Sequence, residues 1–178
     1  MKLSFEFVDA QRVEEKEELV EELATTFKES RMIPRRKLDW FKRSIQTDLE
    51  RGFSYIVARD FKSREAIGML SLKPYRPKQQ ELVIFRTNVK EKFWNRGIAN
   101  ALHNHAIGFA RRNGTNTVKW SGMLGNMQRV MQHVVDRNTA KLPNSRFVSR
   151  TQGELDRSQF PDFFIHLKPV RRRAIRPR

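Results

Sequence analysis

The segment that most constrains the fold is a strand, a turn and a helix in the middle of the chain. Residues 81–89, "ELVIFRTNV", are rich in β-forming side chains and predict a central strand. The stretch "KEKFWNRG" follows, and a helical pattern begins at once and ends at Gly114. Its predicted apolar stripe consists of Ile98, Leu102, His105 and Phe109. The unit therefore predicts a turn that brings the amino end of a helix to a sheet.

The rest of the chain alternates strand and helix patterns. Strands are predicted at 3–8, 53–60, 66–75, 115–124, 146–151 and 160–170, and helices at 13–27, 36–52 and 126–138. The second and third strands are joined by a short turn, which predicts a hairpin. Strands with interleaved helices indicate an α/β (α+β) fold, with a mixed sheet and helices on both faces. We expect one domain over residues 1–170 and a basic tail at 171–178.

Charge is distributed unevenly. The net charge is +16, yet residues 1–30 carry 4 basic and 9 acidic side chains, so the rest of the chain is more basic than the total indicates. This excess favours a polyanionic partner, with nucleic acid as the first choice, and disfavours cationic acceptors such as polyamines. The alternative is a solvated basic face with a tail. Nucleic-acid contacts are predicted for the arginines of the tail, which are Arg171, Arg172, Arg173, Arg176 and Arg178.

Other classes of protein are disfavoured by the sequence. The chain has no cysteine, which excludes disulfides and thiolate chemistry. It shows neither an apolar run long enough to span a membrane nor an export signal, so we expect no membrane association and a cytoplasmic location. His103 and His105 are two residues apart and would point to different faces of a helix. We therefore expect no metal site.

The turn before the central helix is suited to an anion. Helix amino termini carry unpaired N–H groups and partial positive charge, and small residues let a phosphate approach the backbone. Gly97 and Ala99 would give that access, Arg96 would add charge, and Asn95 could cap the helix. The dinucleotide and P-loop patterns are both absent. Tight packing alone is the alternative explanation of the turn.

The element order and "VKEKFWNRGIANAL" resemble the GCN5-related N-acetyltransferases. Their signature is Arg or Gln, two residues, Gly, one residue, then Gly or Ala. Gly97 and Ala99 match it, whereas Trp94 stands in place of the Arg or Gln. The resemblance implies acetyl-CoA (coenzyme A) as cofactor, with its pyrophosphate at Trp94, Asn95, Arg96, Gly97, Ile98 and Ala99.

The resemblance also implies contacts along the strand and on the next helix. A bulge near the end of strand 81–89 would separate it from the following strand and leave Thr87, Asn88 and Val89 to bind the pantetheine arm. Asn126 matches an asparagine that contacts the cofactor. Family members carry a tyrosine seven residues further on, as the acid that protonates the leaving thiolate, and His133 stands there instead.

The catalytic prediction uses few groups. Acyl transfer to an amine needs a base and benefits from an acid for the thiolate. His133 is the candidate acid, because imidazole titrates near neutrality. Glu81 is the candidate base, although it precedes by two residues the place where relatives carry a glutamate, and Val83 occupies that place. Both side chains could instead face solvent.

Two functions follow from the sequence. The first is an N-acetyltransferase whose acceptor is carried on or beside nucleic acid, as an aminoacyl-tRNA would be. The second is a protein that keeps the fold without the catalysis and binds nucleic acid, or serves in a protein assembly such as a virus particle or homo-oligomer. The second is favoured by Trp94, by the missing tyrosine and by the absence of a carboxylate at the usual base position.

Overall fold

The structure is a computed structural model of the chain. It describes residues 1–9, 16–31, 33, 35–73, 81–115, 117–120, 147–150 and 162–166. The predicted helix at 126–138 and the basic tail lie outside these residues, and so do Asn126 and His133.

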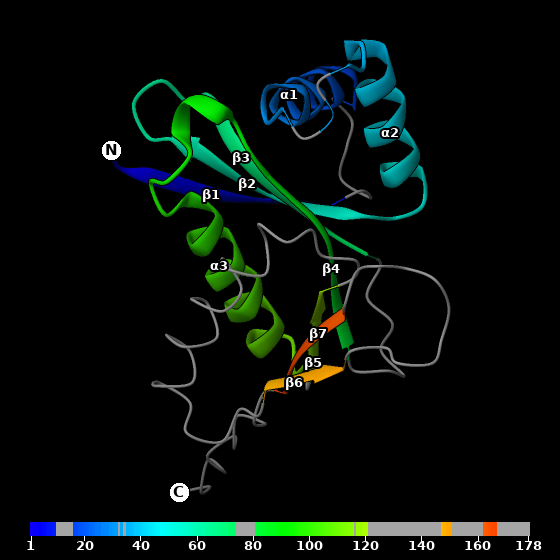
Figure 1. Ribbon diagram of the computed structural model, residues 1–178, viewed down its shortest axis with the longest axis vertical. Coiled ribbons are helices and arrows are strands. Elements are labelled where there is room, and N and C mark those ends of the chain that lie inside the picture. The colour runs from blue at the N-terminus through cyan, green and yellow to red at the C-terminus, as the bar shows by residue number, and fades with distance from the viewer. Residues whose placement is uncertain are drawn as a thin grey trace, which may run out of the picture.

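The described elements occur in the predicted order (Figure 1). They are β1 (Leu3–Val8), α1 (Lys16–Glu29), α2 (Leu38–Glu50), β2 (Ser54–Asp60), β3 (Ala66–Leu72), β4 (Glu81–Val89), the 3-10 helix η3 (Glu91–Phe93), α3 (Ile98–Arg112), β5 (Thr117–Trp120), β6 (Phe147–Arg150) and β7 (Asp162–His166). The predicted hairpin is formed by β2 and β3, which pair antiparallel.

All the described strands belong to a single mixed sheet. The strand order is β1-β2-β3-β4-β5-β7-β6. Only β4 and β5 pair in parallel, and the chain between them includes α3. The other neighbours are antiparallel. The parallel pair therefore lies in the interior of the sheet, where the sequence predicted the central strand.

Helices cover both faces of the sheet, as predicted. Figure 1 shows α1 and α2 on one side and α3 on the other. Side chains of β2 contribute to the apolar core on each face of the sheet, because successive side chains of a strand point to opposite faces. Tyr55 and Val57 pack in the cluster beneath α1 and α2. Ile56 and Ala58 pack in the cluster beneath α3.

A bulge interrupts β4, as the resemblance implies. Leu72 of β3 pairs with Ile84, but its neighbour Ser71 pairs with Arg86, so Phe85 is the additional residue on β4. The β4–β5 ladder ends on the same side of the bulge, at Ile84. Residues of β4 that follow the bulge therefore lie beyond the described pairing with β5.

The predicted apolar stripe of α3 was wrong in part. The buried residues are Ile98, Leu102, His103, Ala106, Ile107 and Ala110. His105 is exposed and stacks on Phe5 of β1, with ring centroids 3.8 Å apart. Phe109 is half-buried and stacks on Phe7. The edge strand β1 thus covers the flank of the helix, and the histidine that enters the core is His103.

Candidate cofactor site

The turn between η3 and α3 is shaped by two residues in the left-handed region. Asn95 has a φ of 60° and Gly97 a φ of 75°. Gly97 is the N-cap of α3, and its carbonyl accepts the N–H of Ala101. A Cβ added at Gly97 would meet no atom within 4 Å. Glycine is therefore favoured here by backbone conformation, and a small side chain at this position would meet no described atom.

The first α3 residues differ in what they can offer a ligand. Ile98 is buried in the core, so only its backbone can contact a phosphate. The N–H groups of the first helical turn precede the first intrahelical hydrogen bond and point out of the helix end. Arg96 is exposed, with its guanidinium carbon 5.6 Å from the Phe93 ring centroid. The expected Asn95 cap is not formed, because Gly97 holds the N-cap position without a side-chain hydrogen bond.

Trp94, the departure from the family signature, has a defined structural role. Its ring is 47% exposed, and its Nε1–H donates to the carbonyl of Val89 at 2.7 Å. This bond links the turn to the last residue of β4. A donor at the signature position is therefore retained although the residue type is different.

The end of β4 presents the other predicted cofactor residues. The side chain of Thr87 is buried on the α3 side, where its Oγ1 lies 3.1 Å from His103 Nε2. Asn88 points to the opposite face, and its Nδ2–H donates to Ser30 Oγ at 3.1 Å. Val89 is buried against the α3 core. These side chains are engaged inside the protein, so a pantetheine arm would be held by the backbone of this segment.

His103 is a residue of the site that sequence reasoning missed. Its Nδ1 lies 2.7 Å from the carbonyl of Ala99, which can only accept, so Nδ1 carries the proton. Nε2 then accepts the hydroxyl proton of Thr87. Burial lowers the pKa of His103 to about 4, and the ring is neutral at physiological pH. His103 therefore joins the first turn of α3 to the end of β4. The only signal in the sequence was its helical position four residues after Ala99.

The last residue of α1 and the two residues after it contact the end of β4 and the segment that follows it. Glu29 forms an ion pair with Lys90 at 3.1 Å, and Arg31 forms one with Glu91 at 2.7 Å. Between them, Ser30 accepts the Asn88 hydrogen bond. The entrance to the turn is thus fixed to the helix on the opposite face of the sheet.

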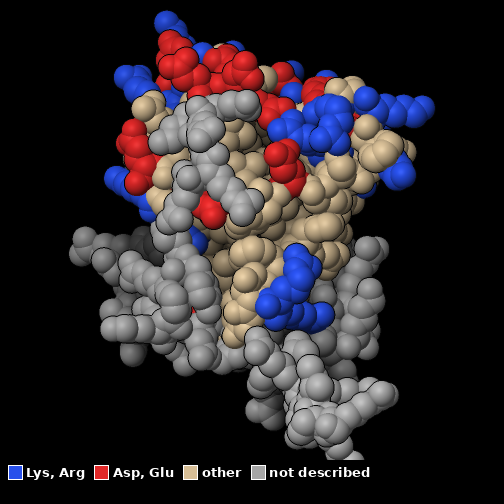
Figure 2. Space-filling model, turned by 180° about the vertical axis from the view of Figure 1, so that it is seen from behind, with Lys and Arg blue, Asp and Glu red and all other residues tan. Residues whose placement is uncertain are grey.

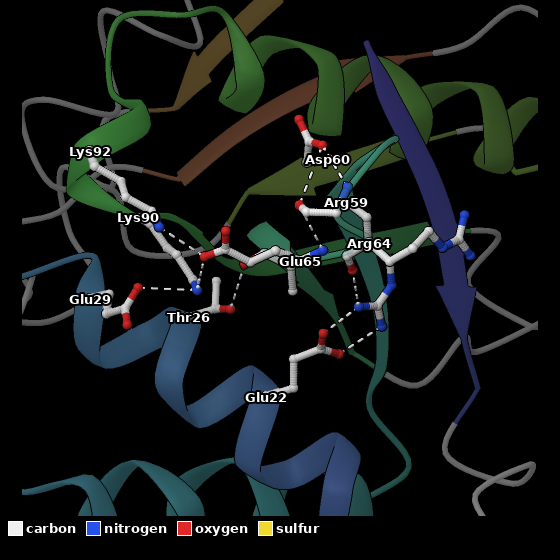
Figure 3. Close-up of polar contacts among 11 residues, drawn as sticks. Glu22, Thr26, Glu29, Arg59, Asp60, Arg64, Glu65, Lys90 and Lys92 are labelled. Atoms are coloured by element: carbon white, nitrogen blue, oxygen red, sulfur yellow. Dashed lines mark hydrogen bonds and ion pairs between the residues drawn. The ribbon is translucent and has the colours of Figure 1, made fainter. Parts of the chain in front are cut away.

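Lys90 is the centre of this connection, as Figure 3 shows. Its side chain is 7% exposed, and its Nζ lies 2.9 Å from Glu65 and 3.1 Å from Glu29. Burial opposes the charge, but the two carboxylates outweigh it and raise the pKa of Lys90. Lys92 shares Glu65 from a more exposed position. The β2–β3 hairpin therefore also supports the cofactor turn.

Arg59 anchors the same hairpin to α1 (Figure 3). Its guanidinium bonds both carboxylate oxygens of Glu22, and it also pairs with Glu6 of β1 at 2.8 Å. Thr26, one helical turn after Glu22, donates to the carbonyl of Ala66 at 3.5 Å. The hairpin that carries Glu65 is thereby fixed in position.

The structure does not place either predicted catalytic residue, Glu81 or His133, at the turn between η3 and α3. Glu81 is the first residue of β4, half-buried, and pairs with Thr117. It lies four residues before the bulge, about 13 Å at the usual strand rise. His133, the proposed acid, and Asn126 lie outside the described residues. The structure therefore leaves both catalytic assignments as predictions.

Charged side chains are intermixed on the face that Figure 2 shows. Acidic and basic residues stand side by side at the upper end of the view, the end that carries α1 and α2 in Figure 1. A smaller basic group lies lower, among uncharged residues. On this face the described basic side chains do not form one continuous surface. The tail arginines, to which the nucleic-acid contacts were assigned, lie outside the described residues.

The described part of the chain contains neither a cluster of metal ligands nor a membrane-spanning helix. No group of three His, Cys, Asp or Glu side chains that could hold a metal ion occurs there. No described helix is long and apolar enough to cross a bilayer.

Comparison with known proteins agrees with this geometry. The model of the acetyltransferase (GNAT) family matches residues 16–133, well over half of the chain. No curated protein matches the sequence significantly.

Solved acetyltransferases share the fold. Tetrahymena GCN5 superposes with a TM-score of 0.62 at 15% identity, covering 94% of this chain and 98% of that one. A Bacillus subtilis acetyltransferase in complex with CoA superposes with a TM-score of 0.57 at 18% identity, covering 94% of this chain and 100% of that one. The PaiA N-acetyltransferase of Thermoplasma acidophilum, also in complex with CoA, gives 0.55 at 12% identity, covering 94% and 100%. The cofactor of the family is acetyl-CoA. Together, the strand–turn–helix unit, the bulged central strand and the family match show that this chain belongs to the GNAT acetyltransferase family.

Proposed function

We propose that this chain is an N-acetyltransferase that binds acetyl-CoA along the end of β4 and at the turn Trp94–Ala99. The observation that carries the proposal is the left-handed Gly97 at the start of α3, where an added Cβ would meet no described atom within 4 Å, with Arg96 beside it in the sequence. A helix terminus of this shape can receive a pyrophosphate without a steric barrier. The family match supports N-acetyl transfer as the general reaction.

The residues present fit the cofactor at both of its ends. Backbone N–H groups at the start of α3 would bond phosphate oxygens, and Arg96 would contribute positive charge. The backbone from Thr87 to Val89 would hold the pantetheine arm, because the described β5 ladder ends before this segment. When bound, acetyl-CoA supplies an acetyl group activated as a thioester.

Two side chains are proposed for proton transfer. Glu81, four residues before the bulge, would accept a proton from the incoming amine through bridging water, and His133 would donate one to the departing sulfur. If these roles hold, Glu81→Gln and His133→Phe should each lower kcat by about 10²-fold or more, with little change in coenzyme A affinity. An unchanged kcat would remove the residue from the mechanism.

The test of the proposed function starts with binding. Titration of the full chain with acetyl-CoA in a calorimeter should give saturable binding, and free thiol should then be released in the presence of amines. Gly97→Glu should remove the binding, because it adds a carboxylate where the pyrophosphate would lie. Normal binding by a folded Gly97→Glu protein would place the cofactor elsewhere.

The acceptor amine is proposed to be carried on, or bound beside, a nucleic acid. The basic composition and the arginines of residues 171–178 support it. The competing proposal is a catalytically inactive member that binds nucleic acid or joins a protein assembly. Absence of acetyl-CoA binding together with nucleic-acid affinity would favour that competitor.

A further inference from the structure

A hollow of about 480 Å³ opens between α2 and β4 on the face of the sheet that α1 and α2 cover. Its volume is in the range of small-molecule sites. The residues that give it chemical character are Trp40, Arg43, Asp48, Arg51, Phe85 and Arg86. Guanidinium groups and aromatic rings thus dominate the lining.

One of the three arginines is built into the protein. The Arg86 guanidinium lies 3.2 Å from Asp48 and 3.2 Å from Ser44 Oγ. Its carbon is 4.9 Å from the ring centroids of both Phe27 and Phe85. Because its side chain is only 18% exposed and held on several sides, Arg86 is a preorganised donor rather than a solvated charge.

Asp48 balances only part of the positive charge. It is buried, and its Oδ2 accepts the Tyr55 hydroxyl at 3.0 Å in addition to facing Arg86. Burial raises the pKa of Asp48, although Arg86 acts in the opposite direction. Within the described part of the chain, Arg43 and Arg51 have no carboxylate at ion-pair distance. Arg51 acts on Asp48 only at longer range, where its charge lowers the pKa of that carboxyl, so among the described residues the hollow presents two guanidinium groups without a direct ion pair.

The position of the hollow connects it to the proposed cofactor strand. Phe85 is the bulged residue of β4, and Arg86 directly precedes Thr87. With the pyrophosphate at the turn that follows β4, an arm running back along Thr87–Val89 would direct its thioester toward the bulge. A molecule in the hollow would then lie next to the reactive end of the cofactor.

We propose that this hollow binds the acetyl acceptor, a small primary amine that carries an oxyanion, either a carboxylate or a phosphate. The proposal rests on the proposed acetyltransferase function. Arg43 and Arg51 would bind the oxyanion, since guanidinium forks match the geometry of both groups. Trp40 and Phe85 would contact the apolar part of the acceptor.

The reaction balances without a further reagent. The amine nitrogen forms a bond to the acetyl carbon, and the carbon–sulfur bond of the thioester breaks. One proton leaves the nitrogen and one reaches the sulfur, so the products are an amide and the free thiol of coenzyme A. The oxyanion of the acceptor is unchanged, and it serves only to position the amine.

The first experiment compares acceptors that carry an oxyanion with acceptors that lack one, with thiol release as readout. 4-Aminobutyrate is paired with 4-aminobutanamide, and phosphoethanolamine with ethanolamine, and putrescine represents cationic amines. The anionic member of each pair should have a kcat/KM at least about tenfold higher, the scale expected for one charged hydrogen bond. Arg43→Gln and Arg51→Gln should raise KM for the anionic acceptors about tenfold and leave the affinity for acetyl-CoA unchanged. Arg112→Gln, an exposed arginine at the end of α3, is the matched control and should behave as wild type.

A second measurement separates this inference from the proposed function. Inorganic phosphate is titrated into full-length Gly97→Glu protein, in which the proposed pyrophosphate turn is blocked, and binding should be weakened by added Arg43→Gln or Arg51→Gln but not by added Arg112→Gln. Equal kcat/KM for amines with an oxyanion and amines without one would overturn the acceptor assignment while leaving the acetyltransferase function standing. Absence of transfer to any amine, with phosphate binding that depends on Arg43 and Arg51, would overturn the proposed function and support the oxyanion site. Phosphate binding unaffected by both substitutions would overturn the site itself.

Discussion

Thr87 and His103 are joined by a buried hydrogen bond of 3.1 Å, from the end of β4 to the second turn of α3. The same imidazole donates to the carbonyl of Ala99 at 2.7 Å. A single neutral ring therefore fixes the strand segment proposed for the pantetheine arm relative to the helix terminus proposed for the pyrophosphate. Protonation would convert the acceptor Nε2 into a second donor and place a charge in the core.

We expect acid to destabilise the protein through His103. Its pKa is about 4 in the folded protein against 6.5 for an unperturbed histidine. Because the folded value is the lower one, the unfolded chain binds more protons between these values. The stability that depends on a neutral His103 is fully present above pH 6.5 and is lost as pH falls toward 4. The total loss in the free energy of unfolding is about 3 kcal/mol. Urea unfolding at pH 7.5 and pH 5 measures it.

Replacing His103 with glutamine distinguishes the effect of protonating the imidazole from the effect of its packing. His103→Gln should be less stable at pH 7.5 but lose less free energy of unfolding on going to pH 5. His105→Gln, on an exposed residue of the same helix, should keep most of the wild-type acid sensitivity. Equal acid sensitivity in wild type and His103→Gln would show that other groups cause it.

Gly97 offers a matched comparison with Gly114 at the other end of α3. Both have positive φ, and a Cβ on either would meet no atom within 4 Å. Alanine should therefore cost roughly 1 kcal/mol of stability at each position, from the backbone alone. Only Gly97→Ala should also weaken coenzyme A binding, because only that residue shapes the proposed pyrophosphate turn. Equal coenzyme A affinity of the two variants, measured by calorimetry, would argue against the turn.

Trp94 is expected to act through its indole N–H. Trp94→Phe removes the donor to the Val89 carbonyl and keeps an aromatic ring. Loss of one hydrogen bond of about 1 kcal/mol should weaken coenzyme A binding about fivefold, if the bond orders the turn. Trp94→Gln supplies an amide donor and should bind more tightly than the Phe variant. The reverse order would show that ring contacts, not the hydrogen bond, matter at this position.

Lys90 and Lys92 share Glu65 but differ in burial, and this gives a paired prediction. Lys90→Met keeps the apolar stem and removes a buried charge bonded to two carboxylates, so it should cost about 2 kcal/mol. Lys92→Met removes an exposed partner and should cost less than about 1 kcal/mol. Thermal unfolding of both variants tests the difference. Equal losses would mean that burial of Lys90 contributes nothing.

Local patterns in the sequence predicted the elements and the turn. β-Forming residues 81–89 and the glycine before a helical pattern were sufficient for β4 and the start of α3. The bulge came only from the family resemblance, since nothing in the composition of β4 distinguishes Phe85 as the additional residue. Its position depends on pairing with β3, a contact between distant parts of the chain.

The features that sequence reasoning missed depend on several elements at once. Asp48, Tyr55 and Arg86 come from α2, β2 and β4 and meet only after the sheet forms. The helical pattern assigned His105 to the buried side of α3, whereas the residue buried there is His103. Phe5 of β1 covers His105, and Thr87 meets His103. A helical period alone cannot choose between them, because β1 lies almost a hundred residues earlier in the sequence.

The last prediction concerns the basic tail. Residues 171–178 contain five arginines and no acidic residue, and they follow β7, which ends at His166. If they contact phosphates, binding to RNA or DNA should show little sequence preference and a steep dependence on salt. Deleting residues 171–178 should lower the slope of log affinity against log salt concentration by up to about 4, at roughly 0.7 to 0.9 per lost contact. Replacing the five arginines with lysine should preserve the slope, because the charge is kept. Fluorescence anisotropy at several salt concentrations measures all three proteins. A full-length protein without nucleic-acid affinity at low salt would contradict the prediction, and the tail would then require a partner with an acidic protein surface.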